Sequence, residues 1–315
     1  MDAAQLNETD DVAIPPLTVG TAIRAVSPQF LALSVMLSIH GVGLAVWSGS
    51  FDAGLAVLSI IGLMCLHIAI NVFNDWHDWC RTVIDHYTEH TAFSGGSGML
   101  PRGEITPRAA LGISCTGLAI GVSIGLYMTW RCGWPVFVIG VAGVTAVIFY
   151  TPVFAKLGIG EIVAGLGLGT LPVVGIFYVL VGTITPAAWW SAAASGFLTY
   201  NLLLVNEFPD AYADALGGRR HMVILLGRPR AARLFAVMEI SAFVVIIAGV
   251  IAGVLPPWAL LGLIGLPFAI KSIVFTFRHN ADPDEMPPAQ ANHVLSTLSL
   301  NTFLGVGYII AAFLG

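Results

Sequence analysis

Residues 52–85 read DAGLAVLSIIGLMCLHIAINVFNDWHDWCRTVID, and this stretch decides the class of fold. Its first part, 52–74, is predominantly apolar and reaches the roughly 20 residues that a helix needs to cross a bilayer. Its second part, NVFNDWHD at 71–78, places amides and acids at the end of that segment. Acids at membrane depth are expensive and are functional candidates by default. This stretch therefore predicts a membrane-spanning helix that ends in acidic residues.

Apolar stretches of this length recur along the chain. Of the 315 residues, 57% are hydrophobic and 10% are charged, whereas soluble domains carry about 25% charged residues. Backbone polar groups in lipid must be satisfied internally, so we expect helices rather than open strands. The sequence predicts an all-α integral membrane protein with nine transmembrane helices, at 26–48, 52–74, 109–129, 134–151, 161–183, 187–208, 233–254, 257–277 and 294–314.

The N-terminal residues differ from this apolar body. Residues 1–16 are polar and acidic, and they lack the positive region and short apolar core of a cleavable signal peptide. We expect a disordered arm over 1–21 and one transmembrane domain over 22–315. The net charge of −5 argues against a nucleic-acid partner. The four cysteines form no CxxC pair, so the sequence indicates neither a disulfide framework nor a zinc site.

Lysines and arginines sort to one side of this nine-helix arrangement. If the N-terminus is cytoplasmic, only Arg131 among the 13 Lys and Arg residues falls on the outer side. Because positive residues concentrate in cytoplasmic loops, we expect a cytoplasmic N-terminus and an external C-terminus. The three long loops, at 75–108, 209–232 and 278–293, are then cytoplasmic as well.

A second acidic motif repeats the first. The sixth predicted helix ends in NEFPDAYAD, residues 206–214, and both motifs begin Asn-x-Phe-x-Asp. The two motifs lie four helices apart, so their helices run in the same direction and both motifs open on the same, cytoplasmic side. Pro209 is expected to distort or end the second of these helices.

Helical spacing brings the polar groups of each motif onto one face. Carboxylate and amide oxygens, without cysteine or clustered histidine, suit a hard cation, and magnesium prefers a few carboxylates together with substrate phosphate oxygens. The alternative is that these acids only cap helices and solvate loops. The candidate ligands and neighbouring amides are Asn71, Asn74, Asp75 and Asp78 in the first motif, and Asn206, Asp210 and Asp214 in the second.

At these residues the chain resembles the UbiA superfamily of intramembrane aromatic prenyltransferases, over roughly residues 22–314. Members have nine transmembrane helices, a first motif NDxxDxxxD and a second motif DxxxD. Here Thr82 stands where the first motif has its last acid, and the next acid is Asp85. We expect Asp85 to complete the magnesium site, on the same face as Asp78 if the helix continues through Trp79–Ile84. Asp85 could instead simply cap or solvate its loop.

Other fragments are similar to one branch of that superfamily, the 1,4-dihydroxy-2-naphthoate polyprenyltransferases of menaquinone synthesis. They are FSGGSGMLP at 93–101, Tyr150-Thr-Pro followed by Lys156 and Gly160-Glu161, and the run from Asn206 to Gly218-Arg219-Arg220. The resemblance implies a helical bundle around a central cavity. It also implies magnesium-dependent transfer of a polyprenyl group from an allylic pyrophosphate to an aromatic acceptor within the bilayer.

The resemblance also implies roles for individual residues. Two magnesium ions would bridge the acidic motifs and the pyrophosphate, and arginine or lysine would donate to phosphate oxygens. Among the basic residues we favour Lys156 and Arg220 over Arg24. The expected catalytic residues are Asp75, Asp78, Asp210, Asp214, Lys156 and Tyr150. The expected pyrophosphate contacts are Arg24, Lys156, Arg219, Arg220, Asn71 and Asn206. The expected metal ligands are Asn74, Asp75, Asp78, Asp85, Asp210 and Asp214.

Two kinds of alternative remain open on the sequence. Within the superfamily the acceptor could be 4-hydroxybenzoate, homogentisate or a glycerol-phosphate lipid, or there could be none, as in a terpene cyclase. Outside it, a secondary transporter also combines two halves with acids in the membrane. Acids at cytoplasmic helix ends beside basic loops favour pyrophosphate chemistry over transport.

Overall fold

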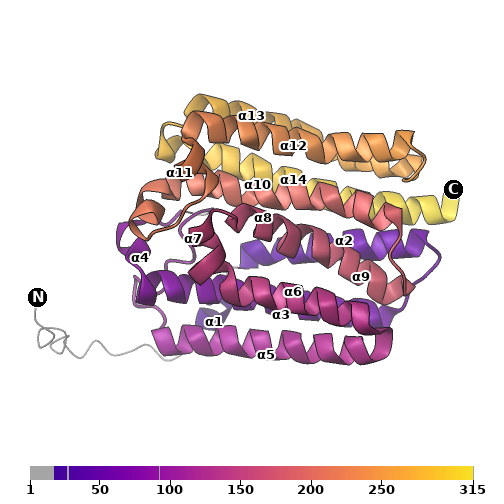
Figure 1. Cartoon of the computed structure of the whole chain (residues 1–315), viewed down its shortest axis with the longest axis horizontal. Coiled ribbons are helices and arrows are strands. Elements are labelled where there is room, and N and C mark those ends of the chain that lie inside the picture. Colours follow the sequence, from indigo (N-terminus) through magenta and orange to yellow (C-terminus); the bar gives the residue numbers. More distant parts are fainter. Residues whose placement is uncertain (1–17, 27, 92, 315) are drawn as a thin grey trace, which may run out of the picture.

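The computed structural model describes residues 18–26, 28–91 and 93–314, and within these ranges the chain is helical and contains no β-strand (Figure 1). Each of the nine segments predicted from the sequence is helical over most of its described residues, which confirms the all-α class. The long helices are α2 (Pro28–Trp47), α3 (Ala53–Arg81), α5 (Pro107–Cys132), α6 (Trp134–Phe149), α9 (Leu171–Val181), α10 (Pro186–Leu216), α12 (Arg228–Ile251), α13 (Leu266–His279) and α14 (Pro287–Leu314).

Seven helical stretches in the described part of the chain are long and apolar enough to cross a membrane. Helix α2 contributes a shorter apolar stretch, Leu31–Trp47, and α10 is not among the seven. The count of nine membrane spans therefore stays a prediction. The seven stretches are Ala53–Arg81, Pro107–Cys132, Trp134–Leu157, Gly160–Val181, Arg228–Ile251, Pro257–His279 and Pro283–Leu314.

Helices α3 and α10 carry the two motifs and extend beyond their predicted ends. Helix α3 reaches Arg81, so the whole first motif is helical. Helix α10 passes through Pro209 to Leu216, so of the two effects expected of this proline, the helix does not end there. A proline removes one backbone hydrogen bond, but the neighbouring Val205 and Phe208 are fully buried against α12. Ala211, which follows the proline, packs against the same cluster, so the packing holds the helix on both sides of Pro209.

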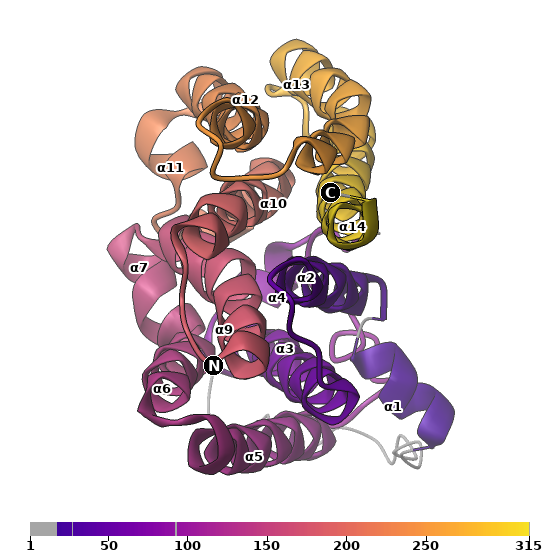
Figure 2. The same cartoon turned by 90° about the vertical axis from the view of Figure 1, so that its right-hand side faces the viewer.

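Short helices gather at the end of the bundle where α3 and α10 finish (Figure 1). They are α4 (Ile84–Tyr87), α7 (Ala155–Leu157) and α11 (Met222–Leu226). Figure 2, which views the bundle along the helices from the opposite end, shows α9 beside both α3 and α10. The end of α14 lies at that opposite end. The polar motifs and the C-terminal helix end are therefore at opposite ends of the bundle.

The predicted N-terminal arm, 1–21, lies outside the described residues as far as residue 17. Its last residues, 19–21, are not an arm but the start of α1 (Val19–Ala25). Thr18 caps this helix, because its hydroxyl accepts the Thr21 N–H at 3.1 Å. A local capping box thus orders residues that composition alone assigned to the arm.

A glycine-rich segment positions one wall of the bundle. Helix α8 (Gly160–Ala164) continues into the π-helical turns Gly165–Thr170 and then into α9. A Cβ atom on Gly165 or Gly169 would come within 2.8 Å of a backbone carbonyl oxygen of α10. Only glycine permits so close an approach, and small residues serve this purpose between membrane helices. As a result, the turns Gly165–Thr170 are held directly against α10.

Candidate active site

Both acidic motifs line a single cavity of about 220 Å³ at the end of the bundle that carries α4 and α11. The expected convergence of the two motifs is thus observed. Its deeper walls are apolar and include Leu33, Ile70, Leu168 and Leu202. The expected site residues that line the cavity are Asn71, Asn74, Asp75, Asp78, Asp85, Tyr150, Asn206, Asp210, Asp214 and Arg219.

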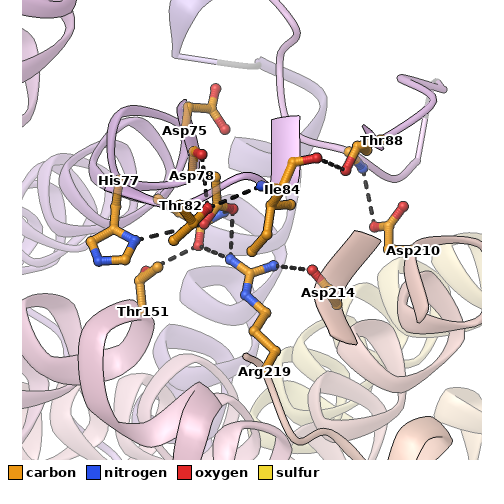
Figure 3. Close-up of polar contacts among 12 residues, drawn as sticks. Asp75, His77, Asp78, Thr82, Ile84, Thr88, Thr151, Asp210, Asp214 and Arg219 are labelled. Carbon is orange, nitrogen blue, oxygen red and sulfur yellow. Dashed lines mark hydrogen bonds and ion pairs between the residues drawn. The ribbon is translucent and has the colours of Figure 1, made fainter. Parts of the chain in front are cut away.

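Arg219 joins the two motifs (Figure 3). Its guanidinium donates to Asp78 of the first motif at 2.6 Å and to Asp214 of the second at 2.8 Å. Burial opposes the charge of this guanidinium, but Asp214 and Asp78 hold the pKa of Arg219 well above its usual value. The planar fork of arginine suits such a double contact. One cation therefore holds the two acidic helix ends together.

A hydrogen-bond chain orients the carboxylate of Asp78. Asn74 donates to Asp78 Oδ2 at 3.2 Å, and the amide oxygen of Asn74 accepts from Arg219 at 3.0 Å. The same oxygen accepts the hydroxyl of Thr151 at 2.9 Å. Thr151 lies in a π-helical turn, Tyr150–Phe154, of a kind that is frequent at functional sites. Asn74 thus acts in the structure as an orienting group between the motif, the arginine and this turn.

The glycine-rich segment after the first motif lies against two of the acids. The backbone N–H of Ser97 donates to Asp75 at 3.1 Å, and that of Gly95 donates to Asp210 at 3.2 Å. Gly96, between them, has φ = 67°, and a Cβ there would lie 2.3 Å from Asp75 Oδ1. Glycine is required at this position by both its conformation and its surroundings. One loop therefore bridges Asp75 and Asp210.

The end of the first motif differs from the prediction. Helix α3 stops at Arg81, and Thr82 is its extended C-cap, so the expected helix through Trp79–Ile84 does not form. The Thr82 hydroxyl donates to the Asp78 carbonyl at 2.8 Å and accepts the Ile84 N–H at 3.1 Å (Figure 3), which ends the helix. Asp85 nevertheless lines the cavity from α4. Asp85 and Asp78 thus meet through a turn rather than along one helix face.

The electrostatics around Asp85 favour a cation beside it. Burial, with the nearby charges of Asp78 and Asp75, raises the pKa of Asp85 to about 8. A positive charge next to these groups would stabilise their ionised forms. The exposed Cys80 thiol, two residues before Thr82, does not line the cavity.

The donor set fits magnesium. Asp78 Oδ1 is buried without a hydrogen-bond partner in the described part of the chain. Among the described residues, no group of three or more His, Cys, Asp or Glu side chains is arranged to hold a metal by itself. Magnesium is usually bound through one or two carboxylates with substrate phosphates and water. Carboxylates spread around a cavity with room for a pyrophosphate match that mode of binding.

Three predicted phosphate-binding residues do not line the cavity. Arg24 on α1 pairs with Glu104 at 3.1 Å on the surface. Lys156 on α7 is exposed. Arg220 is also exposed, and its backbone N–H donates to the Ala155 carbonyl at 2.9 Å. The preference for Lys156 and Arg220 is therefore not supported by this geometry, which places Arg219 among the acids instead.

Sequence reasoning missed a group of buried residues beneath the second motif. Glu207 and His221 line the cavity, and Glu161 of α8 lies beside Glu207. Glu207 occurs three residues before Asp210 and seven before Asp214, which puts it on their helix face. This spacing was the signal in the sequence that could have identified Glu207 as a cavity residue. His221 and Glu161 are brought in only by the turns after α10 and before α8.

Comparisons with known proteins agree with this geometry. The sequence profile described as the UbiA prenyltransferase family matches residues 34–294. The 1,4-dihydroxy-2-naphthoate octaprenyltransferase of Bacillus subtilis (strain 168) is 26% identical over 295 residues, which are 91% of each chain. The enzyme of the same name from Escherichia coli (strain K12) is 25% identical over 300 residues, covering 92% of this chain and 95% of that one.

Solved structures share the fold. A UbiA homologue from Aeropyrum pernix K1, in its apo form, has a TM-score of 0.67 at 20% identity and covers 89% of this chain and 97% of its own. A UbiA homologue from Archaeoglobus fulgidus bound to GPP and Mg²⁺ has a TM-score of 0.61 at 15% identity, covering 92% and 99%. At these identities the likeness establishes the fold.

Proposed function

Because the chain belongs to the UbiA prenyltransferase family, we propose that this integral membrane prenyltransferase uses magnesium to move a polyprenyl group from an allylic pyrophosphate to a hydroxylated aromatic acceptor. We propose 1,4-dihydroxy-2-naphthoate as the acceptor. The names of the Bacillus subtilis and Escherichia coli relatives support this choice. The archaeal homologue that was solved with GPP and Mg²⁺ supports the donor and the metal.

The observation that carries the proposal is the convergence of five carboxylates, from two distant motifs and α4, on one cavity with apolar deeper walls. A polyprenyl pyrophosphate matches this cavity, because its anionic head can bind cations held by the carboxylates and its apolar tail can lie against the deeper walls. Two magnesium ions are proposed at the two motifs. The residues that would hold them are Asp75, Asp78, Asp85, Asp210 and Asp214.

The chain's own residues would then bind and orient the head group. Bound magnesium would neutralise the charge that develops on the pyrophosphate as the allylic C–O bond breaks. Arg219 lies between Asp78 and Asp214 and has further guanidinium N–H groups for phosphate oxygens. Asn74 holds the Asp78 carboxylate in place, and the loop around Gly96 orients Asp75 and Asp210. The apolar walls exclude water from the allylic cation, and the ring of Tyr150 could face it.

An acceptor panel tests the proposal. Purified protein in proteoliposomes is given radiolabelled geranylgeranyl pyrophosphate, magnesium and one acceptor at a time: 1,4-dihydroxy-2-naphthoate, 4-hydroxybenzoate, homogentisate or glycerol 1-phosphate. We expect a prenylated naphthoate product and stoichiometric pyrophosphate release. Product from another acceptor alone would refute the naphthoate assignment. Substrate movement across the bilayer without pyrophosphate release would refute the enzymatic proposal in favour of a transporter.

A further inference from the structure

A second group of polar side chains lies in the cavity beneath the aspartates. Glu207 is 6% exposed, His221 is 4% exposed and Glu161 is fully buried. Glu161 accepts the backbone N–H of Met222 at 2.5 Å through one oxygen. Its other oxygen has no hydrogen-bond partner among the described residues. Glu207 Oε2 and the ring nitrogens of His221 make only longer ion-pair contacts, with one another and with Asp214. Buried polar groups are ordinarily paired, so these atoms indicate a ligand group that completes them.

The charges of the group select the kind of ligand. His221 Nδ1 lies 3.6 Å from Glu207 Oε2, and its Nε2 lies 3.3 Å from Asp214 Oδ2. The neighbouring Glu161 adds a second carboxyl beside Glu207. Such a cluster repels an anionic phosphate but attracts a hydrogen-bond donor. A hydroxyl group carried by an otherwise apolar molecule fits both the cluster and the apolar walls around it.

The position of Glu207 places that ligand at the depth in the cavity where the allylic carbon of the donor would lie. Glu207 shares the cavity-facing side of α10 with Asp210 and Asp214 and lies about one helical turn, roughly 5 Å, deeper than Asp210. A pyrophosphate held by the aspartates would direct its allylic carbon toward this depth. An aromatic ring whose hydroxyl is hydrogen-bonded to Glu207 would therefore lie beside the allylic carbon. That carbon accepts the electrons of the ring.

We propose that Glu207, held by Glu161 and His221, contacts a ring hydroxyl of the aromatic acceptor and takes its proton during attack. This inference rests on the proposed prenyl transfer. The ring electron pair forms the new C–C bond, and the electrons of the broken allylic C–O bond leave with the pyrophosphate. The attacked carbon then loses its hydrogen as H⁺, or its carboxyl group as CO₂, and the oxygen regains its proton from Glu207. No oxidant is needed.

The test pairs a change in the enzyme with a change in the acceptor. Glu207→Gln is compared with wild type in the KM values for geranylgeranyl pyrophosphate and for the dihydroxynaphthoate acceptor. The inhibition constants of 1-hydroxy-2-naphthoate and 4-hydroxy-2-naphthoate are also measured in both proteins. We expect kcat/KM for the acceptor to fall about 10-fold or more, since hydrogen bonds to charged groups are strong, while the donor KM stays unchanged. Wild type should bind one analogue about 10-fold more weakly than the other, and Glu207→Gln should bind the two alike.

Glu239→Gln serves as the control for loss of a buried carboxylate. Glu239 is also fully buried, but it pairs with His293 at 2.9 Å on α14 and does not line the cavity. It should lower thermal stability without altering acceptor kinetics. An equal loss of kcat/KM for the acceptor in both variants would overturn the inference. An altered magnesium requirement in Glu207→Gln, with an unchanged KM for the acceptor, would overturn it as well. If wild type itself prenylates no aromatic acceptor, the proposed function fails instead, which is a separate result.

Discussion

Arg219 donates to carboxylates of both motifs, although its neighbour Arg220 has the same charge and points to solvent. The turn that follows α10 makes this distinction. Gly218 adopts φ = 83°, and the backbone N–H of Arg219 donates back to the Asp214 carbonyl at 2.9 Å. Helical spacing predicts which acids share a face, but it does not predict which of two adjacent arginines a turn will direct inward. The sequence therefore indicated the aspartates, but it named Arg219 only as one of several candidate phosphate contacts.

Replacing Arg219 by lysine should lower kcat/KM for the allylic pyrophosphate about 10-fold to 100-fold. One ammonium group keeps the charge but cannot reproduce the forked contact with Asp78 and Asp214. Steady-state kinetics with the donor varied would measure this, and Arg220→Lys, a change at the adjacent exposed arginine, should match wild type. Equal kinetics in the two variants would show that the bridge has no role in turnover.

Asp85 and Thr82 offer a paired test of the end of the first motif. Asp85 lines the cavity, whereas the Thr82 hydroxyl is fully used in ending α3. Asp85→Asn should therefore raise the magnesium concentration needed for half-maximal activity several-fold and lower kcat. Thr82→Ala should keep the magnesium dependence and lose about 1 kcal/mol of stability with its capping bonds. Magnesium titrations of both variants test this prediction. An unchanged magnesium dependence and kcat in Asp85→Asn would exclude Asp85 as a ligand.

At the scale of elements, helix positions were predictable from apolar runs, but helix ends were not. Composition indicates where the apolar, lipid-facing residues stop, whereas α3 and α10 continue for about two more turns into polar sequence. Val205 before Pro209 and Ala211 after it show why, since both pack in one hydrophobic cluster that supports α10 through the proline. The same limit applies to Asp85, because the short turn between α3 and α4 depends on a single capping threonine.

Catalytic activity should depend on Gly96, in the loop that orients Asp75 and Asp210, far more than on Gly103. Both residues have a positive φ, of 67° and 68°, so alanine costs each a similar backbone strain. A Cβ on Gly96 would meet Asp75, whereas one on Gly103 would meet none of the described residues within 4 Å. Gly96→Ala should therefore cost at least about 10-fold more in kcat than Gly103→Ala, with similar melting temperatures. Equal activity in the two variants would contradict the proposed role of this loop in orienting Asp75.

At the scale of the whole molecule, the site lies at one end of the bundle and the end of α14 lies at the other. The sorting of lysine and arginine predicts that the site end is cytoplasmic. Leu216→Cys and Leu314→Cys place probes at exposed leucines of the two ends. In a background without the four native cysteines, we expect Leu216→Cys to react only from the cytoplasmic side and Leu314→Cys only from the outside. Labelling of both from one side would refute the predicted topology.

We propose that both motifs together bind a magnesium pyrophosphate for prenyl transfer, and the activity of Asp210→Ala is the sharpest test of this proposal. Asp210 is half-buried, and its hydrogen-bond partner in the structure is the Gly95 N–H, so the variant should fold and insert normally. Prenyl transfer is measured with geranylgeranyl pyrophosphate at saturating magnesium and at equal protein abundance. We expect a loss of about 100-fold or more, because a carboxylate that holds a catalytic metal contributes several kcal/mol. Turnover at the wild-type rate would contradict it.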